Sequence, residues 1–296
     1  MINNIARSIL VTAITAPMLI ACGGGSSSGG GATGTLNLQL SDAPVDNLTS
    51  VFITFSGVAL HTAGGTREIV FDQPKKLDLL ALQSGRTATL LEDQVLAAGN
   101  YQWIRLDLSE EAGDLYVIDS AGNQYPLTVP SGAQTGLKLV RGFTVLANGT
   151  TDFTIDFDLR KSVKLPTGGD YKLRPTLKLI DNAEVGAIAG TVDATTRLQV
   201  DCADSQAYAG AVFVFEGADA VVNDADATTS PYVTVPVEDL DNDGVFTYKA
   251  AFLPAGTYTV AYSCQVDDLE TDETLTFTPA QNVTVTAKAT SAANFQ

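Results

Sequence analysis

Apolar and polar residues alternate along most of the chain from residue 34 onward. A period of two is typical of β-strands that have one buried and one solvated face. Gly, Pro, Asn and Asp residues separate the alternating runs, as expected for turns. We therefore predict strands throughout the first half, with one helical turn at residues 77–82. The apolar positions that define these strands are Leu36, Leu38, Leu40, Val51, Ile53, Phe55, Ile104, Leu106, Leu108, Phe153, Ile155, Phe157 and Leu159.

The second half repeats this pattern in shorter runs. Many short strands separated by turn residues are typical of antiparallel sandwiches. We therefore predict an all-β protein with two antiparallel β-sandwich domains of Greek-key type. The strands predicted in the second half are residues 187–192, 211–215, 232–237, 245–251, 258–262 and 283–287.

One short motif occurs in both halves. Residues 96–101 read Leu-Ala-Ala-Gly-Asn-Tyr, and residues 253–258 read Leu-Pro-Ala-Gly-Thr-Tyr. In each case a turn containing glycine precedes a strand that opens on tyrosine. Two explanations stay open, namely two related domains or independent use of the same turn chemistry.

Composition and charge add a domain boundary. The chain has 296 residues, a net charge of −17 and 45% hydrophobic residues, enough apolar material for about two folded domains. Residues 185–296 hold 16 acidic and only 3 basic residues, whereas residues 33–184 hold 18 acidic and 13 basic residues. We predict domains at 34–184 and 185–296, the second of them strongly acidic. Such a surface repels phosphates, so nucleic acid is not an expected partner.

The first 33 residues indicate a signal peptide followed by a tether. Arg7 is followed by an apolar stretch at residues 9–20 that is too short to span a bilayer and contains Pro17. The stretch ends in Leu19-Ile20-Ala21-Cys22, which resembles the lipobox of bacterial lipoproteins. The resemblance implies a signal peptide at 1–21, acylation of Cys22 and a lipid-bilayer anchor with palmitate-type chains. We expect residues 22–33 to form a Gly/Ser tether. Gly23, directly after the cysteine, resembles the residue found there in lipoproteins that are sorted to the cell outer membrane.

With Cys22 acylated, Cys202 and Cys264 remain. Exported compartments are oxidising, so we predict a disulfide between them. The alternative is two buried thiols.

Several motifs in the first domain resemble the bacterial domain-of-unknown-function family number 4382. They are Leu40 to Asp46, Val58 to His61, Gly99 to Leu106 and Ile155 to Asp158, and the match covers roughly residues 33–180. The second domain resembles transthyretin-like and carboxypeptidase-regulatory-like β modules, through Gly186 to Val192, Asp243 to Phe246 and Leu253 to Tyr258. These resemblances imply Ig- or transthyretin-like sandwiches in an envelope lipoprotein, and they imply no chemistry.

No catalytic constellation is predicted. His61 is the only histidine, and it falls at a predicted strand end. Asp156 and Asp158 share one strand face, as do Arg105 and Asp107, and alternation with buried neighbours explains each pair as a solvated face. Asp42 and Asp46 flank Pro44 and are expected to shape a turn. We expect three aromatic residues to pack in the core or at a sheet edge, and a sugar-stacking platform is the alternative. These residues are Tyr101, Trp103 and Phe143.

One loop has the spacing of a calcium site. Asp239, Asp241 and Asp243 alternate before Gly244, and Val245 could add its carbonyl oxygen. The twelfth loop position is Ala250 where an EF-hand has glutamate, so a closing carboxylate would have to come from Asp224, Asp267 or Asp268. An acidic solvated turn explains the same residues, and both interpretations stay open.

These observations favour a non-catalytic envelope lipoprotein that acts as a binding or structural module. Its expected partners are the lipid bilayer, through Cys22, and an envelope or extracellular protein or polysaccharide. A calcium-dependent adhesin and an accessory or degenerate hydrolase are the two alternatives.

Overall fold

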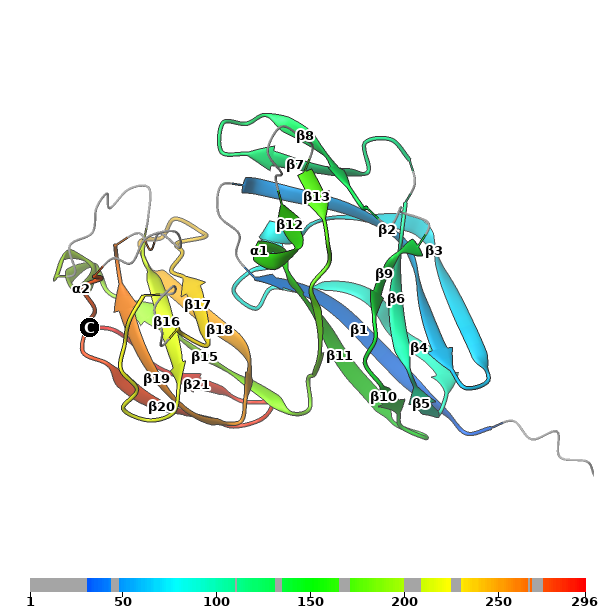
Figure 1. The fold of residues 1–296 in the computed structure, drawn as a ribbon. Coiled ribbons are helices and arrows are strands. Elements are labelled where there is room, and N and C mark those ends of the chain that lie inside the picture. The colour runs from blue at the N-terminus through cyan, green and yellow to red at the C-terminus, as the bar shows by residue number, and fades with distance from the viewer. Residues whose placement is uncertain are drawn as a thin grey trace, which may run out of the picture. The chain divides into compact units, whose positions relative to one another are not determined.

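The computed structural model describes residues 31–43, 48–109, 111–130, 135–164, 171–199, 209–224, 230–265, 267 and 274–296. These residues form an almost entirely β structure, so the predicted fold class is confirmed (Figure 1). Within the described ranges, no helix is long and apolar enough to cross a membrane.

The first part of the chain is built from a four-stranded and an eight-stranded sheet. The four-stranded sheet has the order β14-β11-β1-β4. A separate pair, β5 with β10, adds a small ladder. The strands of the four-stranded sheet and of this pair are β1 (Thr33–Ala43), β4 (Ala88–Ala97), β11 (Thr150–Asp158), β14 (Leu177–Asp181), β5 (Gly99–Tyr101) and β10 (Phe143–Val145).

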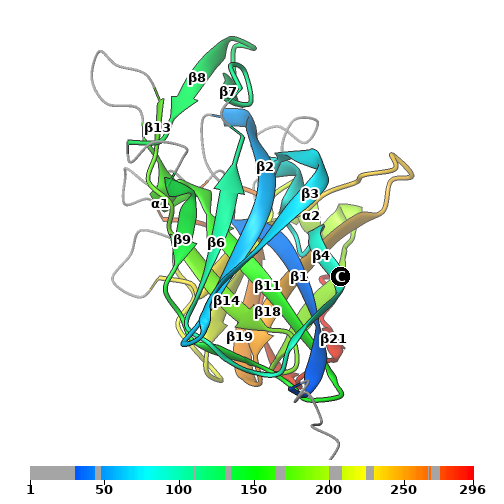
Figure 2. The same cartoon turned by 90° about the vertical axis from the view of Figure 1, so that its right-hand side faces the viewer.

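The eight-stranded sheet has the order β12-β13-β8-β7-β2-β6-β9, with β3 also paired to β2 (Figure 2). Two short helices interrupt this part, and the predicted helical turn at 77–82 is observed as the 3-10 helix η1 (Leu79–Leu82). The other helix is α1 (Leu159–Ser162). The strands of the sheet are β2 (Leu48–Thr62), β3 (Gly65–Asp78), β6 (Trp103–Leu108), β7 (Leu115–Asp119), β8 (Gln124–Thr128), β9 (Leu137–Leu139), β12 (Val163–Lys164) and β13 (Tyr171–Leu173).

The alternating apolar residues meet in one core, as their period predicts. Leu36, Leu38 and Leu40 of β1 and Val51 of β2 are fully buried, and the other strand-defining residues are buried in the same cluster. Two pairings in this part of the chain differ from the antiparallel prediction, because β8 runs parallel to β13 and β1 runs parallel to β11. In the second of these pairs, Leu38 of β1 lies opposite Phe153 of β11. Parallel neighbours need a long connection, and here more than a hundred residues join the two strands.

The second part has a three-stranded and a four-stranded sheet in the orders β18-β15-β21 and β17-β16-β19-β20. Residues 211–215 of β16 are all buried, because a main cluster covers one face and Phe277 with Leu275 covers the other. The elements are β15 (Val185–Val192), α2 (Ala194–Gln199), β16 (Ala211–Glu216), β17 (Val233–Pro236), β18 (Phe246–Pro254), β19 (Gly256–Ser263), β20 (Gln281–Val285) and β21 (Thr290–Ala292).

The hydrophobic clusters follow the change in composition. The buried residues of the first cluster end at Leu179, and those of the others begin at Ile188. Contacts nevertheless group Ala32–Gln296 in one compact unit, so a division at 184/185 stays a prediction.

Candidate functional site

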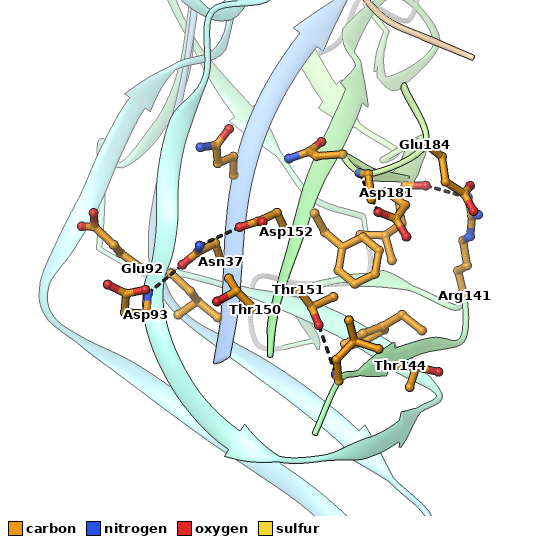
Figure 3. A pocket seen from close by; sticks show the side chains of 18 of the residues that line it. Asn37, Glu92, Asp93, Arg141, Thr144, Thr150, Thr151, Asp152, Asp181 and Glu184 are labelled. Atoms are coloured by element: carbon orange, nitrogen blue, oxygen red, sulfur yellow. Dashed lines mark hydrogen bonds between the residues drawn. The ribbon is translucent and has the colours of Figure 1, made fainter. Parts of the chain in front are cut away.

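A groove of about 820 Å³ lies on the polar face of the four-stranded sheet (Figure 3). We call it the sheet groove. Its floor carries Asn37 and Gln39 from β1 and Thr150 and Asp152 from β11, which alternate with the core residues of the same strands. This volume is within the ~300–1,000 Å³ range of small-ligand sites.

A β-bulge in β4 shapes one wall of the groove. The pairing of β1 with β4 shifts between Leu36 and Leu38, and Asp93 takes a left-handed φ of 46°. Such bulges redirect side chains and are frequent beside binding sites. Figure 3 shows Asn37 between this bulge and β11, where its Oδ1 accepts from the Asp93 N–H at 2.7 Å and its Nδ2 donates to Asp152 Oδ1 at 2.6 Å. Asn37 thus fixes the wall to the floor.

The opposite wall comes from the segment before β10 and the turn after β14. Arg141 donates from Nη1 to the carbonyl oxygen of Leu179 at 2.6 Å, which holds its guanidinium against the wall. Asp181 accepts from the Ala183 N–H at 2.8 Å and thereby closes the turn that carries Glu184.

The lining is rich in carboxylates. It contains two cationic residues, Arg141 and Lys288, and five acidic residues. The acidic residues are Glu92, Asp93, Asp152, Asp181 and Glu184. In the part of the chain that the structure describes, the side chains of Glu92, Asp93 and Glu184 have no hydrogen-bond or ion-pair partner. The groove therefore offers uncompensated negative charge, and sequence reasoning missed all of these residues.

The Asp156 and Asp158 pair is not a simple solvated face. Asp156 is half-buried, and burial raises the pKa of its carboxyl, while Lys178 opposes the shift and Asp158 adds to it. Asp158 is the N-cap of α1, because its Oδ1 accepts a hydrogen bond from the Lys161 N–H at 3.1 Å. Its Oδ2 also forms an ion pair with Lys161 Nζ at 2.7 Å. Asp156 is therefore only partly solvated on its strand face, and Asp158 has a structural role.

The aromatic platform is not assembled. Tyr101 and Phe143 are buried and stack on each other with centroids 5.0 Å apart. Trp103 instead lies half-exposed on the eight-stranded sheet, stacked on His61 at 4.8 Å, with Lys138 Nζ 4.2 Å from its ring centroid. His61 is at the end of β2, as predicted, and its Nδ1 is 2.9 Å from Thr66 Oγ1.

Arg105 and Asp107 lie on the same outer face of β6 as Trp103. Arg105 pairs with Asp107 at 2.5 Å and with Glu68 at 3.3 Å. The pairing raises the pKa of Arg105, mainly through the hydrogen bond to Asp107. These charges stabilise the sheet face.

The predicted calcium loop brings its three aspartates together. Asp239, Asp241 and Asp243 each offer an oxygen, and these atoms all lie within 4.8 Å of one another. Asp239 also accepts from the N–H groups of Asp243 and Gly244, both at 3.1 Å, and Asp243 accepts from the Val245 N–H at 2.8 Å.

The closing carboxylates considered for this loop do not join it. Asp224 is fully buried and, like Asp267, is not part of the three-residue group. Asp268 lies outside the described residues. The loop therefore offers three carboxylates, without the bidentate glutamate of an EF-hand.

Other predicted site residues fall partly outside the description. Cys22, Cys202 and Asp46 lie outside the described residues. Cys264 is fully buried after β19, and its pairing with Cys202 stays a prediction. Asp42 is buried in β1, where its Oδ1 accepts from the Leu159 N–H at 3.3 Å, so it supports the start of α1 and is not part of an exposed turn.

One known family matches the first part of the chain. Residues 33–175 match the family described as Domain of unknown function (DUF4382). The groove's floor and its β4 wall lie within the residues that match this family, whereas Asp181, Glu184 and Lys288 lie beyond the end of the match. No curated protein sequence matches the chain.

Solved structures give only distant likenesses. A leucine-rich repeat protein from Bacteroides thetaiotaomicron has 15% identity and a TM-score of 0.23, with 89% of this chain covering 26% of that one. The Bacillus anthracis TIE protein has 12% identity and a TM-score of 0.19, with coverages of 90% and 34%. The major pilin subunit of Bacillus cereus has 11% identity and a TM-score of 0.22, with coverages of 89% and 99%. The chain thus spans about a quarter to a third of the first two, and scores this low carry no argument about function.

Proposed function

We propose that the protein is a non-catalytic binding module of the cell envelope, with the sheet groove as its ligand site. The groove carries the proposal, because it is ligand-sized and rests on paired strands whose opposite face is the hydrophobic core. Sites built on such rigid elements hold their lining groups in place without further ordering. Glu92, Asp93 and Glu184 supply unengaged acceptors for a ligand.

The proposal includes a lipid anchor at Cys22 in the outer membrane. It is supported by the Leu19-Ile20-Ala21-Cys22 motif and the Gly/Ser tether. Several acyl chains would hold the protein firmly, where one chain gives marginal binding. Replacing Cys22 by serine should move the protein from the membrane fraction to the soluble fraction. A Cys22→Ser variant that sediments with membranes as firmly as the parent would rule the anchor out.

A calcium-dependent adhesin is the second candidate. The observation in its favour is the approach of the Asp239, Asp241 and Asp243 oxygens within 4.8 Å. Oxygen-only ligands suit calcium, and the −13 charge of residues 185–296 would be reduced by a bound cation. The hydrolase alternative has less support, because Asp158 is engaged in the α1 cap.

Crosslinking from the groove tests the proposed function. A photo-crosslinking side chain at Thr150 on the groove floor should capture a defined envelope component in living cells. The same side chain at exposed Asp72, which is not part of the groove lining, is the matched control. Equal capture from both positions, or no capture from Thr150, would contradict a ligand site in the groove.

A further inference from the structure

The acidic residues of the sheet groove are spread over several elements. Glu92 and Asp93 belong to the β4 bulge and Asp152 to the floor (Figure 3). Asp181 is the last residue of β14, and Glu184 belongs to the turn that follows. The two cationic residues leave three negative charges uncompensated in the lining. A ligand that fits must therefore carry several positive charges at separate points.

We infer that the sheet groove binds an extended polypeptide segment rich in lysine or arginine. The inference rests on the proposed binding function and adds the class of ligand.

The spacing of the carboxylates argues against a single metal ion. A metal ion needs several oxygens around one point. Among the described residues, Asp239, Asp241 and Asp243 form a group of three potential metal ligands whose oxygens lie within 4.8 Å of one another. No described residue of the sheet groove belongs to a group of this kind. The two acidic regions therefore suit different ligands, with the loop suited to one compact cation and the groove to a chain of cations.

Neutral groups in the lining favour a peptide over a simple polyamine. Gln39, Thr89 and Thr150 line the groove, and their side chains have no hydrogen-bond partner among the described residues. Each offers both a donor and an acceptor, which match the N–H and C=O groups of a peptide backbone. A polyamine carries donors alone when protonated, so it would leave the donor groups of these residues unused.

Binding of short charged probes to the full chain tests the inference. The probes are fluorescein-labelled hexalysine, labelled hexaglutamate, and unlabelled spermine as competitor, measured by fluorescence anisotropy at low ionic strength. We expect hexalysine to bind, hexaglutamate not to bind, and spermine to compete only at concentrations well above those of unlabelled hexalysine. Binding should weaken strongly at ~1 M salt, where the Debye length is ~3 Å.

Matched variants separate the groove from the general acidity of the protein. The groove variant Glu92→Gln/Asp93→Asn/Glu184→Gln removes three unpartnered charges, and asparagine tolerates the left-handed φ at position 93. The control Asp72→Asn/Glu111→Gln/Glu216→Gln removes three exposed charges outside the groove. We expect about tenfold weaker hexalysine binding in the groove variant, or ~1.4 kcal/mol, and less than about twofold in the control.

Three results would overturn the inference. They are equal losses in both variants, competition by spermine as strong as that by hexalysine, and no hexalysine binding at all. If hexalysine does not bind while the crosslinker at Thr150 still captures a component, the ligand class is wrong and the binding function stands. If both fail, the proposed function fails as well.

Discussion

The hydroxyl of Tyr258 donates a hydrogen bond to the carbonyl oxygen of Pro254, four residues earlier, at 2.9 Å. Tyr101 makes the same bond to Ala97 at 3.0 Å. These are the tyrosines of the motif that occurs in both halves of the sequence, so the shared motif has a shared structure. Both tyrosine rings are nearly fully buried, and each bond satisfies a carbonyl at a strand-to-strand corner, as in the tyrosine corner of sandwich domains.

Removing the hydroxyl from either tyrosine should destabilise the fold. We expect Tyr258→Phe and Tyr101→Phe each to lower the free energy of unfolding by ~1 kcal/mol, because each substitution removes one partly buried hydrogen bond. Urea denaturation followed by circular dichroism measures the change. Tyr232→Phe is the control, since Tyr232 is 41% exposed and its hydroxyl has no hydrogen bond in the described structure. Equal effects of all three substitutions would contradict the corner's role.

Local periodicity predicted the strands well, because it records which side of each strand is buried. Leu36, Leu38 and Leu40 lie in the core as their alternation requires. Periodicity does not record which distant strand is the neighbour, so the parallel pairing of β1 with β11 could not be predicted. Nor does it show how far the polar side of a strand is covered, and for this reason the partial burial of Asp156 could not be predicted.

The groove could not be predicted from the sequence either, because periodicity does not record which distant strands are neighbours. It depends on the bulge at Asp93 and on Asn37, which bridges two strands far apart in the chain. The acidic loop was visible, because its three aspartates lie within five consecutive residues. Sites within one loop can thus be predicted from spacing, whereas sites on a sheet face require the register.

Stability should fall at alkaline pH because of the buried tyrosines. Burial raises the pKa of Tyr248, and also those of Tyr258, Tyr262 and Tyr101, above the ordinary value near 10. An acid with a raised pKa in the folded state binds its proton more tightly there, so its contribution is complete below pH ~10 and is lost as pH rises through the raised pKa. Urea unfolding between pH 8 and ~11 should show a steep decline.

A tyrosine variant provides the control for this pH dependence. Tyr248→Phe should be less stable at pH 8, because the hydroxyl donates to Ala293 O at 2.7 Å, and should show a shallower alkaline decline than the parent. If the free energy of unfolding of Tyr248→Phe declined with pH as steeply as that of the parent, the decline would be due to other groups, such as the lysines.

The two remaining cysteines should form a disulfide in the exported protein. Cys264 is fully buried, and a bond to Cys202 would close a long loop. The chain-entropy model gives a stabilisation of ~4 kcal/mol for such a loop. Titration of the denatured, unreduced protein should find neither thiol reactive, and reduction should lower the unfolding midpoint. Two titratable thiols in protein purified from the envelope would show that the bond is absent.

Calcium should stabilise the full chain through the acidic loop. At about ten times the dissociation constant, a single bound ion adds ~1.4 kcal/mol to the free energy of unfolding. Thermal melts in calcium and in chelator measure the effect. Asp241→Ala should abolish it while leaving the turn intact, because the loop's backbone bonds are made by Asp239 and Asp243. A melting temperature indifferent to calcium in the parent protein would leave the loop as an ordinary acidic turn.

Asn37 should hold the groove in shape. Its side chain joins the β4 bulge to β11 through the Asp93 N–H and the Asp152 carboxylate. We expect Asn37→Ala to lower the free energy of unfolding by ~1–2 kcal/mol, since a backbone donor and a carboxylate both lose a partner. Gln39→Ala, two residues along the same face, is the matched control with no hydrogen-bonded partner in the described structure and should change stability by less than ~0.5 kcal/mol. Hydrogen exchange should localise the loss, with faster exchange of the Asp93 amide in Asn37→Ala alone. Equal exchange rates in both variants would show that the bulge holds its conformation without Asn37.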